Sequence, residues 1–208
     1  MITDKQIFQV YEEMEKICYE INDMFVATDQ VMGRNGFTTN GNVMRWDASE
    51  TLGSPTTWLP YFSQRLYYKD SNYKKVLGIN LLMKDAELEN TIPFLTCGLI
   101  ISTNDKGIYA SDELYGAGWH KDNPSIENIP NTPMLTTKGE NRHLLTYFLG
   151  LTSIRSLQDL ESLVAEPLVR MYEGINSLEN LKDFNGVAEE ASKNIKSCAL
   201  TLSSITQP

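Results

Sequence analysis

Two apolar runs, at residues 76–84 and 93–102, constrain this chain more than any other feature of its sequence. In both runs apolar residues recur at every second position, which is the period of a β-strand. The connector between them is short and acidic, so the two runs are predicted to form an antiparallel hairpin. A third run of this kind, at residues 142–152, leads directly into a helix start. The sequence therefore predicts a sheet with helices packed on it.

Both faces of the predicted hairpin are substantially apolar. Leu77 and Ile79 share one face of the first strand, and Val76 and Leu82 share the other. Strands of this composition lie in the middle of a sheet, so we expect a helix on one side and partial cover on the other.

Gly78 and Gly98 interrupt the two strands of the hairpin. A glycine inside a strand marks a bulge, packing against an aromatic ring, or the close approach of a backbone or ligand. We interpret both glycines as bulge or packing positions, and ligand approach is the alternative.

A long first helix is predicted over residues 4–27, and residues 1–28 are assigned to it. Thr3 and Gln6 form a capping box at its start. Behind them, apolar residues alternate at spacings of four and three: Ile7, Tyr11, Met14, Cys18, Ile21 and Phe25. Val10, Ile17 and Met24 make this stripe wider than the seam of a coiled coil. We therefore expect the helix to pack on the chain's own sheet, and a homodimer through this face is the alternative to a monomer.

The complete prediction is a single α+β domain spanning residues 1–208. Its sheet and long loops occupy residues 58–152, and a C-terminal helical layer occupies residues 156–204. Pro167 is expected to kink or divide the first helix of that layer. The antiparallel sheet is expected to hold about four to six strands, built on residues 58–69, 75–84, 93–103 and 142–152, and a further short strand is placed at residues 42–46.

Charge and cysteine usage narrow the classes of function. The formal net charge is −9, from 27 acidic and 18 basic residues, which disfavours sequence-independent binding to nucleic acid. Cys18, Cys97 and Cys198 lie far apart within apolar patterns, so buried free thiols in a reducing compartment are predicted. The chain shows no signal peptide and no apolar run of about eighteen residues, so we expect a soluble, cytoplasmic protein without a membrane contact.

No motif for a metal or a cofactor stands out. Asp85, Glu87 and Glu89 alternate in the acidic connector, but the glycine and glutamate that a calcium-binding EF-hand loop requires are missing. The chain has two histidines and no Cys-x-x-Cys pair, which excludes a zinc site of ordinary spacing. We therefore predict a solvated turn at the connector, and neither a metal nor a cofactor.

One cluster combines an acid, a base and glycines. His120 lies near Asp112, Glu113 and Asp122, and a histidine in a loop can serve as a general acid or base near neutral pH. The same residues are consistent with a helix N-cap and an exposed histidine. A small hydrolase or transferase using His120 with one of the three carboxylates is therefore the alternative hypothesis.

The leading hypothesis is a noncatalytic binding module. Residues 61–75 interleave four tyrosines with basic residues in an otherwise acidic chain, a mixture that stacks on bases or anchors a protein partner. The glycine-rich segment 33–41 adds a basic side chain that can contact a phosphate. The proposed ligand is a partner protein or a small anionic, nucleotide-like molecule, and the predicted contacts are Arg34, Arg65, Tyr67, Lys69 and Trp119. Ordinary decoration of a strand by tyrosine and lysine is the simpler explanation of the same residues.

Overall fold

A computed structural model describes most of the chain, in eight stretches: residues 3–39, 44–45, 62–69, 74–83, 93–102, 126–138, 142–175 and 184–201. The first helix, α1 (Asp4–Arg34), begins at the predicted capping box. The amide of Gln6 donates to the Thr3 hydroxyl at 3.3 Å, and the Gln6 side chain accepts from the amide of Thr3 at 2.9 Å.

The sheet is antiparallel and has nine strands in the described part of the chain. Four long strands form its centre: β3 (Phe62–Tyr68), β4 (Lys75–Leu82), β5 (Phe94–Ser102) and β8 (Arg142–Gly150). Five shorter strands extend it: β1 (Thr38–Thr39), β2 (Met44–Arg45), β6 (Ile126–Asn128), β7 (Leu135–Lys138) and β9 (Ala199–Leu200). Along the main path the order is β1-β3-β4-β5-β8-β7-β6, while β2 pairs with β3 and β9 with β8.

The α+β class, the four long strands and the hairpin of β4 and β5 are confirmed. The strand count exceeds the expected four to six because the extra strands are two to four residues long, too short to show an alternating pattern. The short strand placed at residues 42–46 is present as β2. The end of the segment expected to be a helical layer is instead strand β9.

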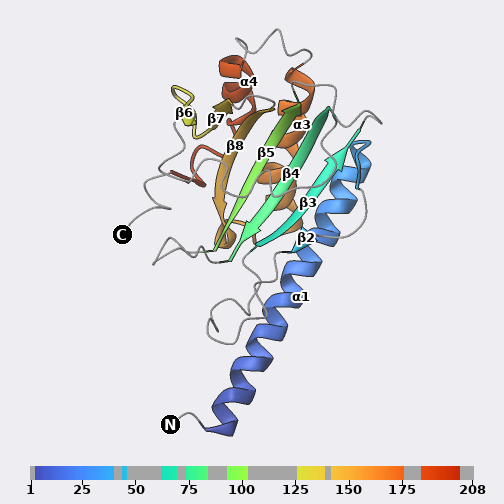
Figure 1. Cartoon of the computed structure of the whole chain (residues 1–208), viewed down its shortest axis with the longest axis vertical. Helices are drawn as coiled ribbons and strands as arrows, with labels where there is room; N and C mark the ends of the chain where they lie inside the picture. The colour runs from blue at the N-terminus through green and yellow to red at the C-terminus, as the bar shows by residue number, and fades with distance from the viewer. Residues whose placement is uncertain are drawn as a thin grey trace.

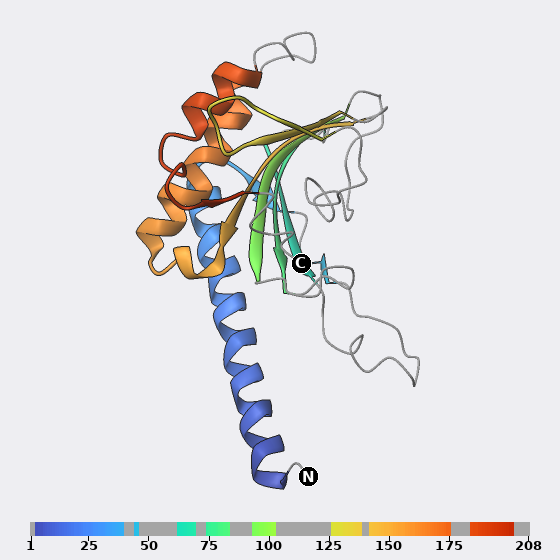
Figure 2. The same ribbon diagram turned by 90° about the vertical axis from the view of Figure 1, so that its left-hand side faces the viewer.

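The helices cover one face of the sheet, as Figures 1 and 2 show. After β8 the chain forms the 3-10 turn η2 (Leu151–Ser153) and then a helix in three parts: α2 (Leu157–Asp159), the π-helical segment η3 (Leu160–Ala165) and α3 (Glu166–Gly174). Helix α4 (Phe184–Ala191) packs against α3. Leu77, Ile79, Cys97 and Leu99 belong to the core cluster that these helices form with the sheet.

The opposite face of the sheet carries a smaller apolar cluster and both strand glycines. The apolar cluster consists of Leu66, Tyr68, Val76, Ile100 and Leu144. Gly78 pairs directly with Gly98 in an unbroken ladder, so neither glycine marks a bulge. The two glycines leave neighbouring positions on this face without a side chain.

The first half of α1 differs from the prediction. The buried residues of α1 are Phe25, Thr28, Val31 and Met32, all in its last ten residues, and the N-terminal half extends away from the sheet (Figures 1 and 2). The expectation that the whole helix packs on the sheet is therefore wrong, because the helix is longer than the surface available to it. Cys18, expected to be buried, is consequently exposed, whereas Cys97 is buried and Cys198 is half-buried.

Pro167 lies near the start of α3, directly after the π-helical segment. Because proline has no N–H, the Leu163 carbonyl cannot receive the bond that residue 167 would donate in an α-helix. The buried Tyr147 hydroxyl of β8 donates to this carbonyl at 2.8 Å and lies 3.3 Å from the Val164 carbonyl. A side chain of the sheet thus replaces the missing backbone donor, and the helix continues past the proline.

Candidate functional site

Two of the predicted contact residues, Arg65 and Tyr67, lie on the face of β3 that the helices cover. Arg65 donates from Nε to Oδ1 of Asp29 on α1 at 3.0 Å and from Nη2 to Oδ2. The Tyr67 hydroxyl donates to Oδ1 of the same carboxylate at 3.0 Å. Burial raises the pKa of Tyr67, and the charge of Asp29 raises it further. These contacts join α1 to the sheet.

This placement leaves little of either side chain exposed to a partner. The side chain of Arg65 is 12% exposed, and Tyr67 is completely buried. The hydrogen bond to Asp29 raises the pKa of Arg65, and burial opposes that effect. Alternation along a strand shows which residues share a face, but it does not show which face the helices will cover.

Lys69 and Arg34 lie apart from that cluster and keep exposed area. The Lys69 ammonium is 5.1 Å from the centre of the Phe37 ring and 3.9 Å from Oε1 of Glu173. Arg34 forms an ion pair with Glu161 of the π-helical segment, and its side chain is 57% exposed. The two residues do not form a common surface with Arg65 and Tyr67, and their binding roles remain predictions.

The remaining predicted site residues lie outside the described part of the chain. They are Trp119 of the binding hypothesis, His120, Asp112, Glu113 and Asp122 of the catalytic hypothesis, and the connector carboxylates Asp85, Glu87 and Glu89. Their roles stay predictions.

The most prominent surface feature of the described residues is an apolar stripe on the projecting half of α1. We call it the α1 stripe and define it by Ile7, Val10, Met14 and Ile17, which are 59%, 61%, 38% and 45% exposed. Four residues of this kind on one helix face are uncommon on a surface that has no partner. Along the same face, further toward the C-terminus, lies the buried part of α1, so a face that packs in the core continues into solvent.

An apolar groove of about 830 Å³ lies where α1 leaves the sheet, and we call it the basal groove. Helix α1 forms one wall, with Ile17, Ile21 and Met24. The opposite wall comes from the ends of β4, β5 and β8 and the helix start that follows, through Met83, Pro93, Leu151, Ile154, Leu157 and Leu160. Leu157 is 49% exposed at this groove. Ile17 belongs to both the stripe and the groove, which makes them one continuous apolar surface.

Polar groups line the margin of the basal groove. Glu20 and Asp23 of α1 lie on one side, and Arg155 and Ser156 on the other. The amide of Asp159 donates to the Ser156 hydroxyl at 3.1 Å, so Ser156 caps the start of the helix at this margin. An apolar centre with a polar margin is the arrangement found in protein interfaces.

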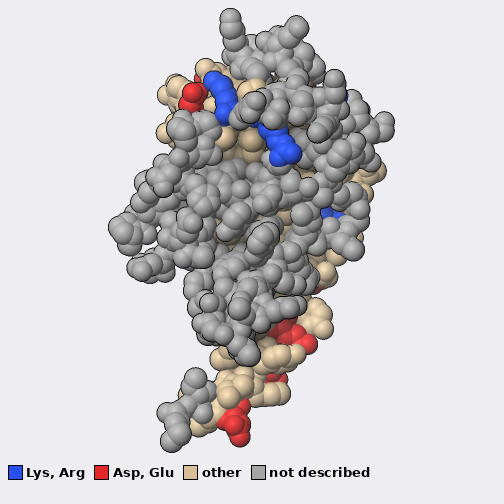
Figure 3. Space-filling view, viewed as in Figure 1, with Lys and Arg blue, Asp and Glu red and all other residues tan. Residues whose placement is uncertain are grey.

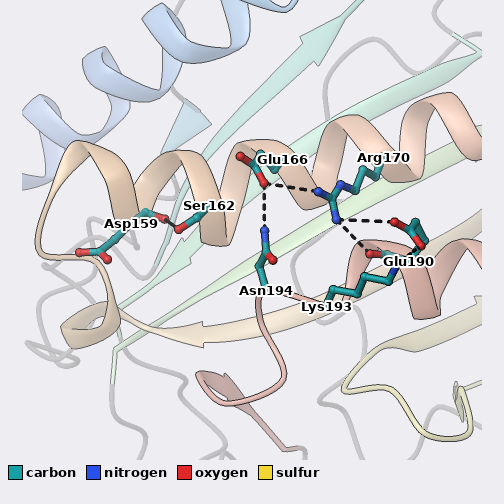
Figure 4. A network of polar contacts seen from close by, with 7 residues as sticks. All are labelled: Asp159, Ser162, Glu166, Arg170, Glu190, Lys193 and Asn194. Atoms are coloured by element: carbon teal, nitrogen blue, oxygen red, sulfur yellow. Dashed lines mark hydrogen bonds and ion pairs between the residues drawn. The ribbon is translucent and has the colours of Figure 1, made fainter.

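A second polar cluster, drawn in Figure 4, connects the C-terminal helices to one another. Arg170 of α3 donates to the Glu190 carbonyl of α4 at 3.2 Å and lies 3.6 Å from Oε2 of Glu166. Asn194 donates to the same Glu166 oxygen at 2.9 Å. The hydrogen bond from Lys193 to the Glu190 carboxylate lowers the pKa of Glu190. All these charges are exposed, so each pair contributes little to stability.

Two features are absent from the stretches of the chain that the structure describes. Within these stretches no helix is both long and apolar enough to cross a membrane. Over the same stretches, no three His, Cys, Asp or Glu side chains come together as ligands for a metal ion.

The sequence did not predict two features of the structure, the contacts of Asp29 and the basal groove. Asp29 interrupts an apolar stretch of α1, which is the signal that it needs a partner, but Arg65 lies 36 residues away and nothing local connects them. The basal groove is formed by segments that are distant in sequence, so no local sequence motif predicts it. Comparison of the chain with protein-family models, with curated proteins and with solved structures found no match.

Proposed function

We propose that this chain is a noncatalytic protein-interaction module that pairs with a second copy of itself through α1. One observation carries the proposal: the same helix bears an uncovered apolar stripe on its projecting half and forms the wall of an apolar groove at its middle. Two copies of such a molecule are complementary, because the stripe of each copy can pack into the groove of the other. A two-fold symmetric pair closes both contacts at once.

An antiparallel arrangement fits the two surfaces together. If the two α1 helices cross at Met14, Ile7 of one copy lies opposite Ile21 of the other, at the wall of the basal groove. The distance from Ile7 to Ile21 along the helix is about 21 Å, enough for four turns of contact. Each projecting half then enters the partner's groove, in the manner of an amphipathic helix bound in a hydrophobic groove.

The charges of α1 also favour the antiparallel arrangement. The projecting half of α1 is rich in acidic residues (Figure 3). In a parallel pair each of these residues would lie beside the same residue of the other copy. Like charges facing one another oppose association.

The other hypotheses have less support from the described residues. A small anionic ligand needs free cationic groups, but Arg65 is engaged by Asp29 and Arg34 by Glu161. The basal groove is mainly apolar, which suits a helix better than an anion. A hydrolase or transferase using His120 remains the alternative and receives no additional support.

A matched pair of variants tests the proposal. Val10 lies on the α1 stripe and is 61% exposed, whereas Val26 is 47% exposed on the opposite side of the same helix. We expect the unmodified chain to sediment as a dimer in analytical ultracentrifugation and Val10→Glu to sediment as a monomer. Val26→Glu introduces the same charge into the same helix and should leave the dimer intact.

Two outcomes would count against the proposal. A monomer at every protein concentration would show that self-association is wrong and would leave the surface for a foreign amphipathic helix. Equal loss of the dimer in both variants would show that the stripe is not the interface. Circular dichroism of each variant checks that the fold survives, which is expected because both side chains are exposed.

A further inference from the structure

A second row of exposed side chains runs along α1, on the side of the helix away from the α1 stripe. Phe8 and Tyr19 of this row are 61% and 64% exposed. Glu12 and Glu15 lie between them at spacings of four, three and four residues, so the four side chains are neighbours on one helix face. At about 100° per residue, this face lies about 150° around the helix from the α1 stripe. We call it the aromatic-acidic face.

The described part of the fold leaves the aromatic-acidic face open, and so does the proposed dimer. The buried residues of α1, such as Phe25 and Met32, lie on the same side of the helix as the α1 stripe. Ile17 and Ile21, which line the basal groove, lie on that side as well. A dimer formed through the α1 stripe therefore keeps the two aromatic rings on its outside. Large apolar side chains that share one exposed face indicate an interaction surface.

The charge of this face favours a basic partner. Two further carboxylates, those of Asp4 and Asp23, lie one helical turn beyond its two ends. Lys5 adds a positive charge at the tip of the helix, and Lys16, beside the face, donates to Glu13 at 2.8 Å. The carboxylates of the face and its ends thus outnumber the cations. A surface of this charge attracts basic segments and repels the phosphates of nucleic acids and lipids.

Each aromatic ring of the face has a carboxylate one helical turn away. Glu12 follows Phe8 by four residues, and Glu15 precedes Tyr19 by four residues. Side chains at this spacing are about 5 to 6 Å apart at Cβ, so one guanidinium can lie over the ring and pair with the neighbouring carboxylate. The centres of the two ring–carboxylate pairs are seven residues apart, which is about 10 Å along the helix.

We propose that the aromatic-acidic face binds a basic segment of a second protein. The segment presents two basic side chains about 10 Å apart, one for each ring–carboxylate pair. Arginine suits these positions better than lysine, because its planar guanidinium stacks on an aromatic ring and also forms directed hydrogen bonds to a carboxylate. This inference goes beyond the proposed dimer and does not depend on it, since every copy of the chain carries its own aromatic-acidic face.

Fluorescence anisotropy with a labelled octa-arginine peptide tests the aromatic rings, in about 0.15 M salt to screen non-specific attraction. We expect the unmodified protein to bind the peptide, and Phe8→Ala/Tyr19→Ala to bind it at least about fivefold more weakly through the loss of two cation–π contacts. Val10→Ala/Ile17→Ala is the matched control, because it shortens two exposed apolar side chains of the α1 stripe and leaves the charge unchanged. That control should bind the peptide as the unmodified protein does.

A second pair of variants tests the carboxylates. Glu15→Gln removes one charge from the aromatic-acidic face, whereas Glu189→Gln removes the same charge from an exposed position on α4. We expect Glu15→Gln to weaken peptide binding by about two- to fivefold, as for the loss of an exposed ion pair. Glu189→Gln should leave binding unchanged. Circular dichroism checks that every variant keeps the fold, which is expected because all the substituted side chains are exposed.

Three outcomes would overturn the proposal. The first is an unmodified protein that does not bind the peptide. The second is equal weakening in either variant and its control, which would show a general attraction between a cationic peptide and an acidic chain. The third is a change in the sedimentation of Phe8→Ala/Tyr19→Ala, which would show that the face contacts a second copy of the chain instead. A monomeric protein that still binds the peptide through Phe8 and Tyr19 would contradict the proposed dimer alone.

Discussion

Asp29 is the residue on which the attachment of α1 to the sheet depends. Its carboxylate accepts both hydrogen bonds of the Arg65 guanidinium and one from the Tyr67 hydroxyl. A bidentate pair of this kind fixes both position and orientation. The charge is only partly shielded, because the Asp29 side chain is 30% exposed and that of Arg65 is 12% exposed.

Removing this carboxylate should destabilise the protein measurably. We expect Asp29→Ala to lower the free energy of unfolding by about 2 to 3 kcal/mol, because it leaves a largely buried guanidinium and a buried phenol without their acceptor. Glu161→Ala, which removes the exposed partner of Arg34, is the control and should cost at most about 1 kcal/mol. Urea denaturation measures both. Equal, small effects would show that Arg65 and Tyr67 find other acceptors.

The helix formed by α2, η3 and α3 depends on an element other than itself. Its Leu163 carbonyl receives a hydrogen bond from Tyr147 of β8 because Pro167 cannot donate one. Tyr147 is completely buried, and burial raises the pKa of its hydroxyl, which stays protonated and able to donate. Strand β8 thus supplies the hydrogen bond that the helix cannot form at Pro167.

A double-mutant cycle tests this coupling. Tyr147→Phe alone should lower the free energy of unfolding by about 1 to 3 kcal/mol, since it leaves a buried carbonyl unpaired. In a Pro167→Ala background, residue 167 regains its N–H and the same substitution should cost less. Thermal or urea unfolding of the four proteins gives the coupling energy. Strict additivity would mean that the proline and the tyrosine act independently.

At the scale of the elements, sequence patterns predicted which residues form strands better than they predicted which faces are buried. Leu77 and Ile79 alternate with Val76 and Gly78, and this local pattern was enough to predict β4 and its pairing with β5. The stripe of α1 was equally clear, yet its first half proved exposed, since a helical pattern does not show how far the opposing surface extends. Arg65 illustrates the same limit: its strand was predicted, but its partner Asp29 comes from a segment 36 residues away.

Protonation of His143 links the stability of the whole molecule to pH. Burial lowers the pKa of His143 below its usual 6.5, and the positive charge of Lys138 lowers it further. Lys138 lies directly across from His143 in the β7·β8 pair and also contacts Glu127 at 3.3 Å. The unfolded chain therefore binds a proton at a higher pH than the folded chain does.

This difference in proton binding has a definite sign. As pH falls through 6.5 toward the lower pKa of the folded state, the unfolded state takes up more protons, so the free energy of unfolding decreases. We expect His143→Gln to lose less stability than the unmodified protein over that interval, as measured by urea denaturation at a series of pH values. His120 is present in both proteins and cancels in the comparison. Parallel pH profiles would exclude a contribution from His143.

The length of α1 also has a mechanical consequence. The helix is continuous from Asp4 to Arg34, and its buried end is held to β3 through Asp29. It therefore behaves as a lever whose fulcrum lies near Phe25. With a rise of 1.5 Å per residue, its free end lies about 31 Å from that fulcrum, so a tilt of about 5° at the core displaces Asp4 by about 3 Å. A change of this size in the packing near Phe25 would therefore alter the position at which the projecting half of α1 meets a partner.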